Sequence, residues 1–248
     1  YEELASDRIC DEYYGVDVQV ASKQISNKSE DALNYIFITD IHFENSKDKQ
    51  DVALYEEVTN IADMAKNDTN IDFVVVGGDS VQGFWDSKDG WKAAITKIME
   101  PLKNCTKPVF VLVGNHDDNA YSTWIENYSE KIVSDLDWKK HVLDPISPAD
   151  IVRPEGDPNA KNYYYDFEKN GKTTRILCLD YNDDRFEFDS RGEVTARKNY
   201  GLYHEAQIKW LAEVGLKGDF DECLVFSHAD MAADQNSIDT TTAGDLEA

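Results

Sequence analysis

Five apolar stretches of this sequence end in residues that can bind a metal ion or carry a proton. They are YIFITDIH (35–42), FVVVGGD (73–79), FVLVGNHD (110–117), RILCLD (175–180) and CLVFSH (223–228). A single histidine at a strand end is more often structural than functional. In an open α/β sheet, however, the carboxyl ends of the strands line the crevice that binds ligands. Five such ends therefore favour one shared functional site.

The side chains at these ends suit a pair of metal ions. Asp40 and His42 are two residues apart, so they point to the same side if the strand conformation persists. Asp79 has two carboxylate oxygens with which to bridge two cations, while Asn115 offers an amide oxygen and His228 a ring nitrogen. Mixed oxygen and imidazole ligands suit Mn²⁺, Fe or Zn²⁺. Two neighbouring ions of this kind polarise a phosphoryl oxygen and supply a hydroxide nucleophile at neutral pH.

Glycines precede two of the candidate ligands. Gly77 and Gly78 stand before Asp79, and Gly114 stands before Asn115. Because glycine has no side chain, the backbone can turn sharply and approach a ligand closely at these positions. We therefore expect tight turns after the second and third of these stretches.

A regular alternation of elements is predicted to position these residues. Strands are predicted at 33–40, 71–79 and 107–117, and amphipathic helices at 51–67, 89–102 and 122–136. Strands that alternate with helices favour βαβ units and a parallel sheet covered on both faces.

The second half of the chain adds antiparallel strands. Residues 163–180 predict a hairpin that turns at Asn170-Gly171, a helix is predicted at 203–215, and a last strand at 222–230. Two stretches between these elements lack a periodic pattern and are predicted to be loops. They are residues 144–162, which hold four of the six prolines, and the charged stretch 180–201.

Composition restricts the partners of the chain. Its 248 residues carry a net charge of −24, and so acidic a surface repels nucleic-acid phosphates, so no nucleic-acid partner is expected. No run of 18 apolar residues occurs, so no membrane span is expected. The four cysteines form no CxxC pair, and buried free thiols are expected at Cys178 and Cys223. The start at Tyr1 without methionine favours a processed, exported product over a cytoplasmic one.

The order of these motifs resembles that of the calcineurin-like metallophosphoesterase family. The matching residues are Asp40-x-His42, Gly78-Asp79, Gly114-Asn115-His116-Asp117 and His228. The resemblance runs from about residue 33 to residue 230. It implies a four-layer α/β/β/α sandwich with two mixed β-sheets and the metal site at the carboxyl ends of the strands. Residues 1–30 would be an N-terminal arm and residues 31–248 the metallophosphoesterase domain.

The resemblance also implies a set of metal ligands. Asp40 and His42 would hold the first of two divalent ions, and Asp79 would bridge both. Asn115 and His228 would hold the second ion. The ions would be Mn, Fe or Zn.

Two further residues would carry the catalytic chemistry by resemblance. His116 would contact the phosphate beside Asn115 and protonate the leaving group, and Asp117 would orient His116. The family counterpart of Asp180 is usually structural. The implied reaction is hydrolysis of a small phosphate mono- or diester.

Two departures from the family pattern bear on this expectation. The final Gly-His-x-His motif is absent, and the remaining histidines, His141 and His204, are expected to be surface or helix-start residues. Either the chain ends before the last strands, which we expect, or it is a weakened, non-catalytic binding or scaffold protein with this fold. Purple acid phosphatases place a tyrosine where this chain has Gln82, so a ferric–tyrosinate centre is not expected.

Overall fold

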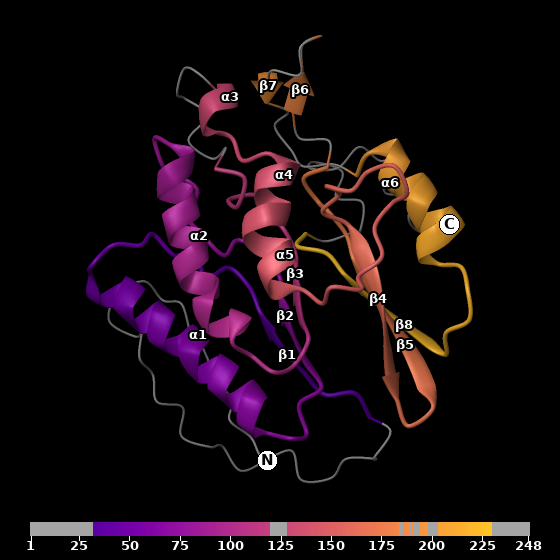
Figure 1. The fold of residues 1–248 in the computed structure, drawn as a ribbon. Helices are drawn as coiled ribbons and strands as arrows, with labels where there is room; N and C mark the ends of the chain where they lie inside the picture. The colour runs from indigo at the N-terminus through magenta and orange to yellow at the C-terminus, as the bar shows by residue number, and fades with distance from the viewer. Residues whose placement is uncertain are drawn as a thin grey trace.

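The computed structural model describes residues 32–119, 128–183, 186–188, 190, 194–197 and 203–229. The expected N-terminal arm and the last nineteen residues, 230–248, lie outside these ranges. Figure 1 shows the described elements along the chain.

The first sheet contains three strands, β1 (Tyr35–Ile38), β2 (Phe73–Val76) and β3 (Val109–Val111). All three are parallel, and the helices α1 (Lys49–Asn67) and α2 (Lys88–Lys103) connect them in turn. The predicted βαβ alternation is therefore confirmed. The resemblance implied a mixed sheet, but among the described strands this sheet is parallel, because each connection is a crossover helix.

Capping residues determine where these helices begin. The Asp48 side chain accepts a hydrogen bond from the Asp51 N–H, so α1 begins two residues earlier than predicted. Ser87 caps α2 in the same way. Helix α2 buries a large apolar face that includes Trp91 and Met99 against the first sheet. These contacts hold the strand ends in place from one side.

The second sheet is mixed. Strand β4 (Tyr163–Lys169) is antiparallel to β5 (Lys172–Cys178), and β8 (Glu222–Phe226) is parallel to β5. The β4–β5 turn lies where it was predicted, and both Asn170 and Gly171 have the positive φ angles of a tight hairpin, 53° and 78°.

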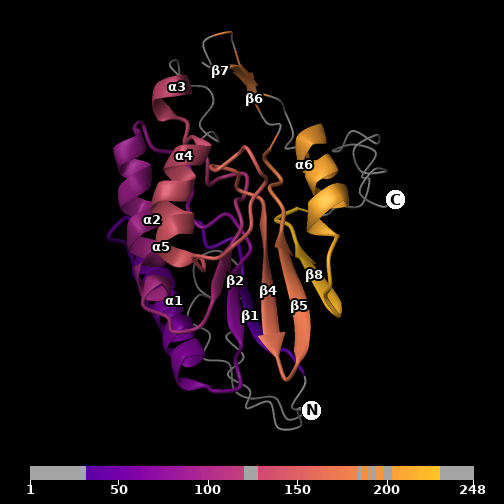
Figure 2. The same ribbon diagram turned by 45° about the vertical axis from the view of Figure 1, so that its right-hand side comes forward.

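The two sheets pack against each other. Ile176 and Cys178 of β5 lie in the same core cluster as the strands of the first sheet. The opposite face of β5 packs through Leu177 on α6 (Glu205–Trp210). Figure 2 shows α1 and α2 outside the first sheet and α6 outside the second. The mixed α/β class with two sheets is confirmed, and the division into four layers stays a prediction of the resemblance.

Tyr163 joins the two sheets by hydrogen bonds. Its hydroxyl oxygen lies 2.8 Å from the backbone N of Val111 and 3.1 Å from the Val111 carbonyl oxygen. The hydroxyl accepts the first bond and donates the second. Strand β3, which ends the sheet order β1-β2-β3, therefore has both backbone groups of Val111 satisfied by a side chain of the second sheet.

The predicted helix at 122–136 is wrong as a continuous element. Its described part contains two short helices, α3 (Tyr128–Lys131) and α4 (Asp135–Trp138). They are separate because Ser134 and Asp137 form a capping box that starts a new helix. From α4 the chain continues through a π-helical turn, η1 (Lys139–Leu143), into the short helix α5 (Asp144–Ile146), at the beginning of the stretch predicted as a loop.

The remaining described elements lie in the last third of the chain. Strands β6 (Phe186–Phe188) and β7 (Val194–Arg197) pair in the stretch predicted to be irregular. The predicted helix at 203–215 is α6 followed by the π-helical turn η2 (Leu211–Gly215). His204 caps it by accepting a hydrogen bond from the Ala206 N–H, as expected for a helix-start histidine.

The expectation of a buried free thiol is confirmed at Cys178 and is wrong about the extent of burial at Cys223. Cys178 is a buried free thiol, and Cys223 is a half-buried one. Among the described helices, none is long and apolar enough to cross a membrane.

Candidate metal centre

The candidate ligands lie beyond the ends of the strands and not within them. Strand β1 ends at Ile38 and β2 at Val76. Asp40, His42 and Asp79 then adopt the left-handed conformation, with φ angles of 55°, 50° and 52°. The expectation that strand conformation persists through Asp40 and His42 is therefore wrong. Residues other than glycine adopt this conformation at a cost, and they cluster at functional sites.

The two turns are held together by backbone hydrogen bonds. Asp40 donates its N–H to Gly78, and His42 donates its N–H to Asp79, at 3.0 and 2.9 Å. Phe43 continues the pattern by donating to the Ser80 carbonyl. The parallel pairing of β1 with β2 thus extends past both strands. This extended pairing brings Asp40 and His42 to one site through left-handed residues, whereas the sequence predicted a continued strand.

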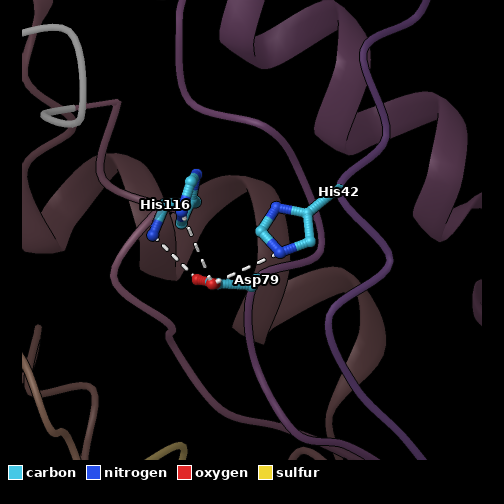
Figure 3. A group of neighbouring side chains, drawn as sticks. All are labelled: His42, Asp79 and His116. Carbon is cyan, nitrogen blue, oxygen red and sulfur yellow. Dashed lines mark hydrogen bonds and ion pairs between the residues drawn. The ribbon is translucent and has the colours of Figure 1, made fainter. Parts of the chain in front are cut away.

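Asp79 lies at the centre of the site, and its side chain is almost completely buried. Its Oδ2 atom is 3.4 Å from Nε2 of His228, 3.7 Å from Nε2 of His42 and 3.9 Å from Nε2 of His116. Its Oδ1 atom accepts the backbone N–H of His116 at 2.7 Å. Figure 3 shows His42 and His116 on either side of this carboxylate. Three imidazoles therefore converge on one carboxylate.

The ligand atoms form two groups that share Asp79. One group contains His42, Asp79 and His116, and the other contains Asp40, Asp79 and His228. The ligand atoms within each group lie within 4.8 Å of one another. Sharing of Asp79 agrees with the bridging role that the resemblance implied. The groups pair Asp40 with His228, whereas the resemblance paired Asp40 with His42.

The hydrogen bonds of His228 hold its ring in an orientation that suits metal binding. Its Nδ1 lies 2.9 Å from the carbonyl oxygen of Gly77, which can only accept, so Nδ1 carries the hydrogen. In the neutral ring the Nε2 lone pair then faces the oxygens of Asp79 and, at 3.0 Å, of Asn115. These three electron-rich atoms repel one another unless a cation, or a proton on Nε2, lies among them. A histidine held through Nδ1–H with Nε2 facing carboxylates is the arrangement of metal-binding imidazoles.

The pKa shifts of His228 and Asp79 also favour a positive charge between these two side chains. Burial opposes a charge on His228, but the hydrogen bond and charge of Asp79 outweigh it and raise the pKa of His228 to about 9. Burial likewise opposes a charge on Asp79, but His228 and the N–H of His116 outweigh it and lower the pKa of Asp79. The protein thus places positive charge beside Asp79, which a bound cation would supply in place of the proton.

His116 is held in a comparable way. Its Nδ1 lies 2.8 Å from the carbonyl oxygen of Gln82, so Nδ1 carries the hydrogen and the Nε2 lone pair faces the centre. The His42 ring lies edge-on to the His116 ring, with 4.5 Å between the ring centroids. The Gln82 carbonyl is a backbone group, so no residue type in the sequence could have indicated this contact.

The carboxylate of Asp117 binds backbone N–H groups of two turns. Its Oδ1 accepts the N–H groups of Ser80 and Val81, and its Oδ2 accepts the N–H of Gly114. The carboxylate therefore joins the turn after β2 to the turn after β3. Asp117 makes no hydrogen bond to the His116 ring, whose Nδ1 is held by Gln82, so its expected orienting role stays a prediction. Burial, with the nearby charge of Asp79, raises the pKa of Asp117 to about 7.

Replacing Asp117 with alanine tests this structural role. The variant leaves three buried N–H groups without their acceptor, and each such loss costs roughly 1–3 kcal/mol. We expect the free energy of unfolding in urea to fall by about 3 kcal/mol. Asp86→Ala is the matched control, since that carboxylate is 91% exposed, and its stability should not change. A stable Asp117→Ala variant that has lost only activity would support the orienting role instead.

Two glycines allow the turns to approach this closely. An added Cβ at Gly114 would lie 2.2 Å from Oδ1 of Asp79 and 2.3 Å from its backbone N. Gly78 has a φ of 102°, and a Cβ there would lie 2.7 Å from Nδ1 of His228. The expectation of glycine-dependent tight turns is confirmed at both positions.

Asp180 lies at the end of β5 but does not join the ligand groups. Its carboxylate is buried 3.1 Å from the ammonium of Lys161, and its backbone N–H and carbonyl bind the side chain of Gln207. Asn182, two residues later, donates its amide to the carbonyl of Gly114 at 2.5 Å. The end of β5 therefore supports the turn that carries Asn115. The roles of Asn182 and Lys161 were not predicted, although Asn182 belongs to the polar run that follows the strand.

Comparisons with known proteins identify the class. The sequence model of the family described as calcineurin-like phosphoesterase matches residues 33–246. The chain belongs to the calcineurin-like phosphoesterase family. The fold is similar to that of a crystal structure of a dimetal phosphatase from Danio rerio, with a TM-score of 0.59 and 17% sequence identity. That alignment covers 87% of this chain and 76% of the other. A search of curated protein sequences finds no significant match.

Family membership and the ligand groups together indicate a metal-dependent phosphoesterase. The expected family and fold are therefore confirmed.

Proposed function

We propose that the chain hydrolyses small phosphate mono- or diesters at a centre of two divalent metal ions. The observation that carries this proposal is the position of Asp79, whose carboxylate is shared by two groups of ligands and faces three imidazole nitrogens. A buried carboxylate with this many imidazole nitrogens around it suits cations better than a packing role.

Five residues would hold the ions. They are Asp40, His42, Asp79, Asn115 and His228. When bound, Mn, Fe or Zn ions polarise the phosphoryl group and lower the pKa of a bound water molecule. The backbone carbonyl of Gly77 keeps the Nε2 atom of His228 available as a ligand. The hydrogen bonds between the two turns fix Asp40 and His42 before any ion binds.

His116 would contact the phosphate together with Asn115 and deliver a proton to the leaving group. The Gln82 carbonyl keeps its Nδ1 protonated, so proton exchange takes place at Nε2, the atom that faces the centre. The ring is 12% exposed, enough to touch a substrate and little enough to be held by its surroundings. A positioned acid of this kind contributes about 10²–10⁴-fold to such reactions.

The charge of the chain favours small substrates. A net charge of −24 repels a polyanion such as a nucleic acid over its whole length, whereas a small ester carries only one or two charges into the site. The exposed side chain of Asp40, at 54%, marks the side of the centre that is open to solvent.

Metal removal and replacement test the proposal. We expect dialysis against a chelator to abolish hydrolysis of phenyl phosphate and of bis-phenyl phosphate, and Mn²⁺, Fe²⁺ or Zn²⁺ to restore it. The same ions should raise the thermal midpoint, since a ligand at 100 times its Kd stabilises the folded state by about 2.7 kcal/mol.

Elemental analysis separates this function from the alternative. About two ions per chain with turnover supports the dinuclear phosphoesterase. Less than one ion per chain, with no turnover at any metal, would favour the non-catalytic binding or scaffold protein.

A further inference from the structure

The segment from Gln82 to Trp85 wraps closely around the candidate proton donor. The Gln82 carbonyl binds Nδ1 of His116 at 2.8 Å. Gly83, with a φ of 75°, lies so close to His116 that an added Cβ would be 2.2 Å from its carbonyl oxygen. Only glycine fits this position, because both the conformation and the space exclude a side chain. The backbone before Phe84 is therefore fixed to His116.

The backbone after Phe84 is fixed as well. The buried side chain of Asn119 accepts the N–H of Trp85 at 3.0 Å and donates to the Trp85 carbonyl at 2.9 Å. The same amide also donates to the carbonyl of Lys131 at 3.0 Å. A side-chain amide that binds both backbone groups of one residue holds that residue as firmly as a strand partner would. Phe84 thus stands between two anchored neighbours.

The ring of Phe84 is exposed although its backbone is fixed. Its residue is 47% exposed, and its ring centroid lies 6.2 Å from that of His116, at an interplanar angle of 87°. Single exposed apolar residues are common and need no explanation by themselves. Here the exposed ring is held beside the one imidazole that is proposed to deliver a proton, on a backbone anchored at both sides.

We infer that Phe84 is a specificity-determining residue that binds a planar aromatic ring in the leaving group of the substrate. This inference rests on the proposed function. His116 is proposed to protonate the leaving-group oxygen, and the exposed ring of Phe84 beside it would then contact the group bonded to that oxygen. An aromatic ring gains from an edge-to-face or offset contact with Phe84, whereas a hydroxyl-rich alcohol such as glycerol gains nothing there. The favoured substrates are phosphate esters of aryl or other aromatic alcohols.

The test compares aromatic and aliphatic esters in the metal-loaded chain. In Phe84→Ala, we expect kcat/KM for phenyl phosphate to fall about two- to tenfold, which is the range of one aromatic contact. The value for glycerol phosphate should stay within twofold. Phe84→Tyr, which keeps the ring, should retain the preference of the original chain. An equal change for both esters, or no change for either, would overturn the inference.

A matched control separates this effect from a general loss of aromatic surface. Tyr35 is 42% exposed, lies at the amino end of β1 and is therefore at the opposite end of the strand from the metal centre. Tyr35→Ala should leave the ratio of the two esters unchanged. The thermal midpoint of each variant shows whether it is folded, and Phe84→Leu provides a second variant that keeps apolar bulk without an aromatic ring.

Binding of phosphonates tests Phe84 independently of turnover. Phenylphosphonate and methylphosphonate are not hydrolysed, so calorimetry reports their affinities directly. We expect the original chain to bind phenylphosphonate more tightly than methylphosphonate, and Phe84→Ala to reduce this ratio two- to tenfold. An unchanged ratio contradicts the role of Phe84. If neither ester is hydrolysed at any metal, the proposed function fails, while the phosphonate ratio still decides whether Phe84 binds aromatic groups.

Discussion

Asp79→Asn is expected to abolish metal-dependent hydrolysis while leaving the chain folded. Asparagine has the same shape, and its carbonyl oxygen can still accept the N–H of His116. It lacks the negative charge, however, and presents an N–H₂ group or a neutral oxygen to His42 and His228. Loss of a residue that merely orients a ligand already costs about 10–100-fold in metal affinity or activity. Since Asp79 is the shared ligand, we expect activity toward phenyl phosphate to fall by more than about 100-fold.

Metal binding is the more direct measurement for this variant. The metal content of Asp79→Asn should fall below that of the original chain, and added metal should no longer raise its thermal midpoint. Asp63→Asn is the matched control, because Asp63 is exposed on α1 and should retain full activity. An Asp79→Asn variant that keeps two ions per chain and its turnover would show that the centre lies elsewhere.

Gly114→Ala is expected to have the second largest effect, through a collision rather than a change of chemistry. The new Cβ would lie 2.2 Å from Oδ1 of Asp79, far inside van der Waals contact. Either the turn after β3 moves outward or the Asp79 carboxylate turns away from the three imidazoles. Overpacking of this kind costs about 1–3 kcal/mol of stability. A displacement of about 1 Å at a reacting centre can reduce the rate about 100-fold.

Comparison of the loss of stability with the loss of activity in Gly114→Ala shows whether the collision acts mainly on the metal centre or on the fold as a whole. We expect urea unfolding to show a modest destabilisation of Gly114→Ala, with a loss of turnover and of metal affinity that is much larger than the destabilisation explains. Gly156→Ala is the control, since Gly156 has a φ of 90° but no atom within 4 Å of an added Cβ. It should lose stability through backbone strain and keep its activity. Equal activity in both variants would refute the proposed contact between Gly114 and Asp79.

The sequence predicted which residues meet because strand ends meet at one edge of a sheet. Asp40, Asp79 and Asn115 follow three neighbouring parallel strands, and His228 follows a strand of the second sheet. Apolar runs with polar ends are visible in a sequence, so the position of the centre followed from the pattern. The ligand assignments themselves stay predictions, which the variants above test.

Backbone groups account for most of what the sequence could not predict. The carbonyls of Gln82 and Gly77 hold the rings of His116 and His228, and every residue has a carbonyl, so the sequence contains no signal for these contacts. The left-handed turns at Asp40 and His42 were missed for a related reason, since aspartate and histidine also occur in strands. The resemblance implied that Asp117 orients His116, but it could not indicate that the Gln82 carbonyl holds the ring of His116 while the Asp117 carboxylate binds backbone N–H groups.

The prediction of one continuous helix at 122–136 was wrong for a different physical reason. The apolar spacing of 122–136 suits one helix, but Ser134 and Asp137 satisfy each other's backbone N–H groups and start a new one. A capping box is readable in a sequence, and greater weight on Ser134 would have divided the helix correctly.

The hydroxyl of Tyr163 also has a consequence for association between molecules. An edge strand exposes backbone N–H and carbonyl groups to which a strand of another chain can pair, and such edges promote aggregation. At Val111 both groups are already occupied by Tyr163. An incoming strand would have to displace that buried hydroxyl from both groups. Tyr163 thus leaves no free backbone group at Val111 for a second chain to pair with, on a strand whose three residues are themselves buried.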